Sequence, residues 1–316
     1  MKPLSAVVSG SAIIAAALLA MPMAAQAQRP QQDTHVAKMN AYVGCINRLS
    51  ARSYDSRKRY FSWVGKNGPT GRERIIYGTY TIYDTSDCRK KVEQANRLEP
   101  RDATIEAAAS AYVEAVSALE PLLKEADDYY EQENYKDDKM AKGKALHPRL
   151  VAAWDAFAKA DQGLRHEVEA INDRRAAEKL VEIEKAEGRQ ARYHVQAVMI
   201  HAKRVLRAQN ADKPDLKEIT AALTEYETIV NATDKFADNN APAGGAKIGS
   251  FFMSAAKSYL VSAKQLMRRI RDKTPYSAGD RMMLNAGSGW MVEGSPPRLL
   301  RDYNQLVDAF NRGANI

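Results

Sequence analysis

Residues 105–123 read IEAAASAYVEAVSALEPLL, and their apolar side chains recur at steps of three and four positions. This period places Ile105, Ala109, Tyr112, Val116 and Leu119 on one face of a helix that packs against a core. The same spacing returns through most of the chain. We therefore expect an all-α fold, an elongated multi-helix bundle with long antiparallel helices. The other expected helices cover residues 33–64, 88–98, 137–209, 215–230, 247–272 and 297–311.

The connections between these helices contain glycine and proline. The run 65–71 (GKNGPTG) ends the first helix, and 75–83 (IIYGTYTIY) favours an extended segment without an obvious partner strand. Pro148 should bend or reset a helix, which leaves open whether 137–209 forms one helix or two. We expect a single domain over residues 28–316, and the break at 212–215 is the alternative boundary.

The N-terminus has the order of parts found in a secretory signal peptide. Lys2 precedes the apolar run 12–21, and Ala25-Gln26-Ala27 is a small-x-small cleavage pattern. The apolar run is shorter than the roughly 20 residues that a transmembrane helix needs. We expect residues 1–27 to be removed by cleavage after Ala27. The mature chain should then be a periplasmic protein without a transmembrane helix.

The composition agrees with a folded, exported protein. Of 316 residues, 27% are charged and 45% are hydrophobic, which excludes a largely disordered chain and a polytopic membrane protein. Two cysteines, Cys45 and Cys88, remain in the mature chain, and an even count in an oxidising compartment favours a disulfide. Their separation is far too wide for a paired zinc-ligand motif. We expect a Cys45–Cys88 bond between two successive helices.

Charge is segregated along the chain. Residues 48–74 hold eight basic and two acidic side chains, and residues 125–138 hold seven acidic and one basic. In an exported protein the basic stretch favours an anionic envelope component, or another envelope protein, over nucleic acid as a partner. We favour the simpler interpretation, a solvated surface, because charge runs are commonly solvated, and mutual attraction between the two stretches is a further alternative.

Motifs of known catalytic chemistry are absent from the sequence. We find no nucleophile elbow, HExxH, P-loop or EF-hand pattern, and two bonded cysteines leave no thiol nucleophile. His166 and Glu169 lie three positions apart on one helix face, a geometry that bundle metal sites use, but we favour a solvated ion pair at the surface as its explanation. We therefore expect no catalytic residue, no metal and no cofactor.

Three stretches together resemble the YiiG-like family, a bacterial domain of unknown function found in exported proteins and lipoproteins. They are residues 128–148 (DYYEQENYKDDKMAKGKALHP), the GPTG of 68–71 with Tyr77-Gly78 and Tyr80, and 303–307 (YNQLV). The resemblance implies an all-helical envelope protein and transfers no catalytic residue. The lipoprotein members need a cysteine at the cleavage site. This chain lacks one there, which implies a soluble periplasmic form.

The most specific of these stretches has two interpretations. The structural one is a turn between long helices, in which Asp137 or Asp138 caps a helix and Asp138 pairs with Lys142. The functional one is a polar, aromatic-edged binding pocket, with these candidate residues: Tyr130, Tyr135, Asp137, Asp138, Lys142 and His147.

The sequence thus predicts a non-enzymatic helical protein of the bacterial cell envelope with a binding or structural role. The alternative is a metal-associated or hydrolytic periplasmic enzyme that uses His166 and Glu169, or His147.

Overall fold

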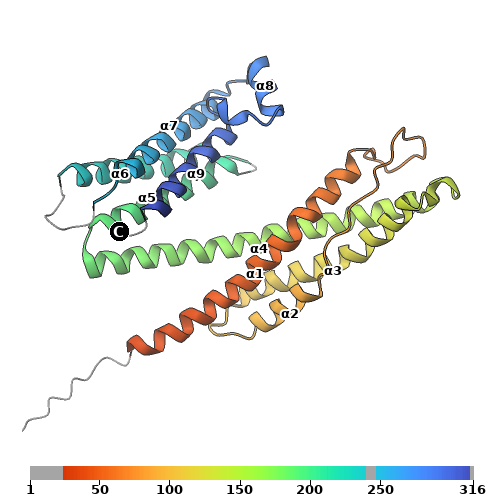
Figure 1. Ribbon diagram of the computed structural model, residues 1–316, viewed down its shortest axis with the longest axis horizontal. Coiled ribbons are helices and arrows are strands. Elements are labelled where there is room, and N and C mark those ends of the chain that lie inside the picture. The colour runs from red at the N-terminus through yellow and green to blue at the C-terminus, as the bar shows by residue number, and fades with distance from the viewer. Residues whose placement is uncertain (1–23, 212, 240–246, 314–316) are drawn as a thin grey trace, which may run out of the picture. The chain divides into compact units, whose positions relative to one another are not determined.

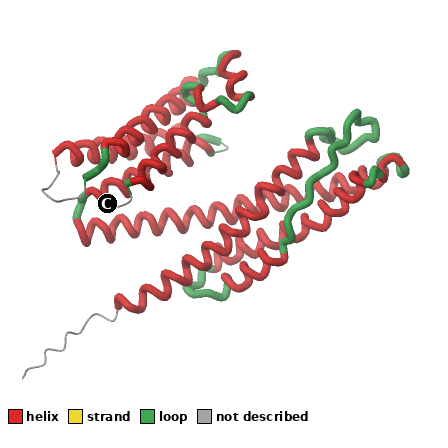
Figure 2. The backbone as a smooth tube through the Cα atoms, in the orientation of Figure 1, coloured by secondary structure: helices red, strands yellow, loops and turns green. Residues whose placement is uncertain are grey.

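The computed structural model describes residues 24–211, 213–239 and 247–313, and within them the chain forms helices and loops with no strand (Figures 1 and 2). This confirms the all-α, multi-helix expectation. The α-helices are α1 (Ala24–Phe61), α2 (Ser86–Ala95), α3 (Ala103–Glu131), α4 (Ala141–Glu187), α5 (Ala191–Asn210), α6 (Leu216–Asn239), α7 (Ser250–Asp272), α8 (Ala278–Asn285) and α9 (Pro296–Arg312). Two single-turn 3₁₀ helices, η1 (Asn134–Lys136) and η2 (Gly289–Met291), lie in the connections.

The chain divides into two compact units, the first ending at Glu169 and the second beginning at Ala170. Helix α4 runs from one unit into the other, so the border lies within a helix rather than at the 212–215 break. Whether the two units unfold together as one domain stays a prediction.

Buried polar contacts join three helices of the first unit. The Ser50 hydroxyl of α1 lies 2.9 Å from the Tyr112 hydroxyl of α3 and donates to Asp161 of α4 over 2.6 Å. All three residues are buried, and the Tyr112 ring packs on that of Phe157 with 6.1 Å between the centroids. Because a buried polar group without a partner is costly, these contacts favour one packing arrangement of the three helices.

The Cys45–Cys88 disulfide is present and links α1 to α2, with 5.4 Å between the two Cα atoms. Both cysteines are buried on the apolar faces of their helices, as expected from the spacing. The connection between these helices, residues 62–85, is the long loop between the ends of α1 and α2 in Figure 1.

The core of the second unit is built from α5, α6, α7 and α9. Tyr226 of α6 and Tyr259 of α7 pack edge to face, and their hydroxyls donate to the carbonyls of Ala256 and Ala202 over 3.0 Å each. The tyrosines thus bury apolar rings while satisfying their polar ends.

Some of the sequence expectations need correction, and others concern residues that the structure does not describe. Residues 137–209 form two helices, which separate after Gly188 at a positive φ of 74°, while α4 continues through Pro148. The short helix α8 was not predicted. Residues 1–23 lie outside the described residues, and Ala25–Ala27 fall in the first turn of α1. The signal-peptide prediction is therefore not tested. Within the described ranges, no helix is both long and apolar enough to cross a membrane.

Candidate functional site

The segment 75–83 is extended, as its composition predicts, but side chains of the first unit replace the missing partner strand. Ser56 of α1 donates to the carbonyl of Tyr80 over 2.6 Å and accepts from its N–H over 3.1 Å. The indole N–H of Trp63 donates to the carbonyl of Gly78 over 2.9 Å. These contacts fix the backbone of the segment against the C-terminal half of α1.

Two arginines of α1 complete this attachment. Arg52 donates through Nε to the carbonyl of Thr81 over 3.0 Å, and Arg59 donates through Nε to the carbonyl of Tyr77 over 2.7 Å. Their guanidinium carbons lie 3.9 Å and 4.3 Å from the centroid of the Tyr80 ring, so two cations share one aromatic ring. Arg59 also donates to the Tyr80 hydroxyl over 2.9 Å.

These residues form an open groove of about 460 Å³. We call it the Arg–Tyr groove; its lining residues are Arg52, Asp55, Lys58, Arg59, Ser62, Tyr77 and Tyr80. Lys58 is exposed, and 47% of Tyr77 is exposed to solvent. In the part of the chain that the structure describes, none of its three cations lies within 4.0 Å of a carboxylate.

The acidic stretch 125–138 interacts electrostatically with the arginines of this groove. Burial raises the pKa of the Asp127 carboxyl, and the neighbouring Glu131 and Asp128 raise it further, while Arg59 and Arg52 oppose the shift. The two oppositely charged stretches therefore do attract one another. The attraction falls short of ion pairs, so the outer guanidinium nitrogens of the groove remain open to an anion.

Two of the three stretches that carry the family resemblance, 68–80 and 128–148, come together beside the groove, and the third, 303–307, lies in α9 of the second unit. Three glycines of the 62–85 loop have positive φ angles, and each packs closely on Tyr130 of α3, on His147 of α4 or on Met140 just before α4, so a side chain there would be strained. A Cβ atom at Gly68, Gly71 or Gly78 would lie 3.0 Å from His147, 3.2 Å from Met140 or 3.2 Å from Tyr130, respectively. The glycines of GPTG and Tyr-Gly are thus explained by close packing of the loop on the residues around them.

An aromatic cluster fills the space beneath this loop; its members are Tyr60, Trp63, Tyr130, His147 and Trp154. The Tyr60 hydroxyl lies 3.0 Å from His147 Nδ1, and their rings stack with centroids 5.8 Å apart. Burial raises the pKa of Tyr60 to about 12, so its phenol stays neutral at physiological pH. Packing therefore accounts for His147, which one of the sequence hypotheses made a candidate catalytic residue.

The start of α4 follows the structural interpretation of the motif. Asp138 accepts from the Lys142 N–H over 2.8 Å and from the Tyr129 hydroxyl over 2.8 Å, so it caps the helix. The Lys142 ammonium pairs with Glu125 at 3.3 Å, and the expected side-chain pair with Asp138 is wrong.

The remaining candidate pocket residues do not converge. Tyr130 is buried in the aromatic cluster, Tyr135 packs half-buried with its ring 6.4 Å from that of Tyr130, and Asp137 is exposed. Ligand binding by the set Tyr130, Tyr135, Asp137, Asp138, Lys142 and His147 stays a prediction.

His166 and Glu169 are both exposed on α4. Throughout the described ranges, no group of three or more His, Cys, Asp or Glu side chains is arranged to hold a metal ion. Neither residue is thus placed in a recognisable metal centre.

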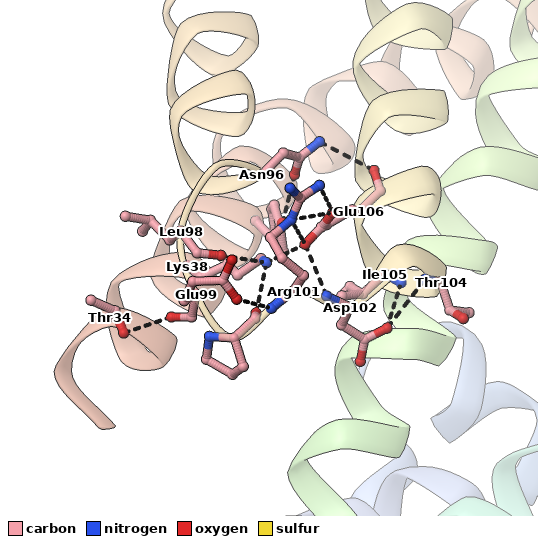
Figure 3. A network of polar contacts seen from close by, with 12 residues as sticks. Thr34, Lys38, Asn96, Leu98, Glu99, Arg101, Asp102, Thr104, Ile105 and Glu106 are labelled. Carbon is pink, nitrogen blue, oxygen red and sulfur yellow. Dashed lines mark hydrogen bonds and ion pairs between the residues drawn. The ribbon is translucent and has the colours of Figure 1, made fainter. Parts of the chain in front are cut away.

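Sequence reasoning missed a buried ion pair at the other end of the first unit (Figure 3). Lys38 is 2% exposed, and its ammonium pairs with Glu106 and donates to the carbonyls of Leu98 and Pro100 over 3.2 Å and 3.1 Å. Arg101 pairs with the same carboxylate at 2.7 Å. Helical spacing could have found Lys38, because it lies four and seven positions before the buried Tyr42 and Cys45.

The electrostatics of this pair point to a structural role. Hydrogen bonds from Arg101 and then Lys38 hold the pKa of the Glu106 carboxyl at about 2, against the opposing effect of burial. The charges are mutually satisfied, and the contacts tie the N-terminal part of α1 to the start of α3.

Comparisons with known proteins place this architecture in a family. The family described as "Protein of unknown function (DUF3829)" matches residues 33–312. The Escherichia coli (strain K12) protein described as "Uncharacterized protein YiiG" is 40% identical over 286 residues, which is 89% of this chain and 80% of the relative. No solved structure matches. The match covers both units and all three resembling stretches, and the chain belongs to the DUF3829 family.

Proposed function

We propose that the protein is an exported, non-enzymatic binding protein of the bacterial envelope, and that the Arg–Tyr groove binds an acidic polysaccharide. The observation that carries the proposal is the pair of guanidinium groups on the Tyr80 ring, with no carboxylate of the described residues within 4.0 Å of them. Although Asp55 also lines the groove, cations that are brought together without a direct ion pair attract an anionic ligand.

The guanidinium groups are held in place yet keep donors available. Arg52 uses only Nε on the protein, and Arg59 uses Nε and one terminal nitrogen, among the described residues. The remaining N–H groups match the planar geometry of a carboxylate or a sulfate ester. Because contacts with the 75–83 segment already restrict the two side chains, binding costs less conformational entropy than it would for free arginines.

The exposed Tyr77 ring favours a sugar polymer over a simple ion. An aromatic face beside cations offers apolar contact to the carbon faces of a sugar ring while the cations take its acidic group. The groove is open rather than enclosed, and an open groove fits a chain that passes through it.

The expected export agrees with such a ligand. A chain that begins with an apolar run followed by Ala25-Gln26-Ala27 fits delivery to the periplasm, where acidic glycans occur and nucleic acid does not. This location is part of the proposal.

Titration calorimetry with polygalacturonate, a carboxylated polysaccharide, tests the proposal against neutral dextran. We expect binding to polygalacturonate that weakens as salt rises, and none to dextran. Absence of binding to polygalacturonate at low salt, or equal binding to dextran, would contradict the proposal.

Charge reversal at the rim of the groove gives the matched comparison. Lys58→Glu should weaken binding about tenfold, or about 1.4 kcal/mol, because Lys58 is exposed and makes no ion pair in the described chain. Lys217→Glu makes the same charge change at an exposed position of the second unit and should leave affinity unchanged. Equal losses in both variants would show only a response to net charge.

A further inference from the structure

The second unit exposes large apolar side chains at one end, around the short helix α8. Met282, Trp290, Met291 and Leu300 are 67%, 45%, 51% and 46% exposed, and we call these four the apolar tip. Helix α8 contains Met282, Met283 and Leu284 yet buries none of its residues. Figure 1 shows α8 beyond the end of α7, outside the packed helices of this unit.

The backbone that carries the tip is well packed, because α8, η2 and the start of α9 meet at Gly289. A Cβ atom there would lie 2.9 Å from Leu284 of α8 and 3.0 Å from Pro297 of α9, so any larger residue would force these side chains to shift. The buried Ser295 hydroxyl donates to the Gly289 carbonyl over 2.7 Å. The exposed apolar side chains are therefore attached to a backbone that packing and a hydrogen bond hold in place.

The segment that carries the tip has a net positive charge. Residues 268–302 hold seven basic and four acidic side chains, a net charge of +3. Three of the four acids are engaged locally: Asp272 pairs with Arg271, Asp280 caps α8, and buried Asp302 pairs with Arg301. The Arg301 guanidinium also lies 5.2 Å from the centroid of the Trp290 ring.

We propose that the apolar tip docks the protein on the surface of an anionic phospholipid bilayer. Trp290 and the methionines would enter the boundary between headgroups and acyl chains, a position that tryptophan favours, while the arginines contact lipid phosphates. A bilayer offers both apolar and anionic groups over one surface, which matches the two properties of the tip.

The net positive charge of this segment also disfavours a second copy of the chain as the partner that covers the tip. A symmetric contact would bring the same positive segment of two molecules together, and like charges at an interface oppose association. The proposal concerns the second unit alone and does not depend on the Arg–Tyr groove.

Vesicle sedimentation tests the docking with protein purified as the cell produces it. We expect binding to vesicles of phosphatidylglycerol mixed with phosphatidylcholine, and at least tenfold weaker binding to phosphatidylcholine alone. The double variant Met282→Ser/Met291→Ser should lose at least tenfold in binding to the anionic vesicles. Val261→Ser, at an exposed apolar position of α7, is the matched control and should bind as the original protein does.

Tryptophan fluorescence reports whether the tip itself enters the lipid. The chain has three tryptophans, of which Trp154 is buried and Trp63 donates to Gly78, so the difference between the original protein and Trp290→Phe isolates Trp290. We expect this difference emission to shift to the blue with anionic vesicles. No vesicle binding, equal binding to neutral vesicles, an unchanged Trp290 emission or equal loss in Val261→Ser would overturn the proposal. So would dimers in light scattering that Met282→Ser/Met291→Ser abolishes, since the tip would then bind a second copy.

Discussion

Replacing Glu106 with glutamine removes the carboxylate at the centre of the buried network in Figure 3 while keeping the size of the side chain. The ammonium of Lys38 and the guanidinium of Arg101 then face a neutral amide. We expect this variant to be less stable than the original protein at neutral pH, and the loss to depend on pH in a defined way.

The size of the effect follows from the pKa of the carboxyl. Its ordinary value is 4.5, and in the folded protein it lies at about 2. Because each pH unit corresponds to about 1.4 kcal/mol, the ionised carboxylate stabilises the fold by about 3 kcal/mol at neutral pH. A lowered pKa contributes stability above pH 4.5, and this contribution is lost as the pH falls from 4.5 through 2.

Urea unfolding at several pH values between 2 and 7 measures the effect. The free energy of unfolding of Glu106→Gln should lie about 3 kcal/mol below that of the original protein at pH 7 and approach it near pH 2. Other carboxylates titrate in the same range, and taking the difference between the two proteins removes their shared contribution.

Glu114→Gln is the control, because Glu114 is exposed on the same helix. Its difference from the original protein should be small and flat with pH. If the Glu106→Gln difference were equally flat, the carboxylate would not be held ionised by Lys38 and Arg101, and the assigned role of the network would be refuted.

Two further predictions concern the loop between α1 and α2. Replacing Cys45 and Cys88 with serine opens a loop of 43 residues and should lower the free energy of unfolding by about 4 kcal/mol through loop-closure entropy. The helix content measured by circular dichroism should be kept. Two titratable thiols in denatured, unreduced original protein would instead show that no disulfide forms. Gly68→Ala should lower the unfolding midpoint in urea, because φ is 96° and the new methyl group would lie 3.0 Å from His147. Gly44→Ala, within α1 with no atom inside 4 Å of the new methyl group, should be neutral or stabilising, and equal losses in both would contradict the packing argument.

Much of the fold could be predicted from periodicity, because the helices are amphipathic and bury one face. The stripe through Ile105, Ala109 and Tyr112 is buried as expected, and the disulfide joins two successive helices. The sequence alone does not decide the division of 137–209, because Pro148 and Gly188 can both interrupt a helix. Only Gly188 ends one, since it adopts a positive φ, while the helix tolerates Pro148 near its start.

The candidate site was harder to predict, because tertiary contacts decide it. The basic stretch pointed to an anionic partner, and Arg52, Lys58 and Arg59 do line a groove. The attachment of 75–83 to α1 depends on side chains of α1 bonding to loop carbonyls, which no local pattern signals. The burial of Lys38 is not predictable from local sequence, because lysines are mostly exposed and this one is buried only with Glu106, 68 positions away.

The most direct test of the Arg–Tyr groove is amide hydrogen exchange with and without polygalacturonate. We expect the ligand to slow exchange in residues 75–83 and at the C-terminal end of α1, and to leave the second unit unchanged. Protection confined to other segments, or none at saturating ligand, would contradict the assignment of this groove as the binding site.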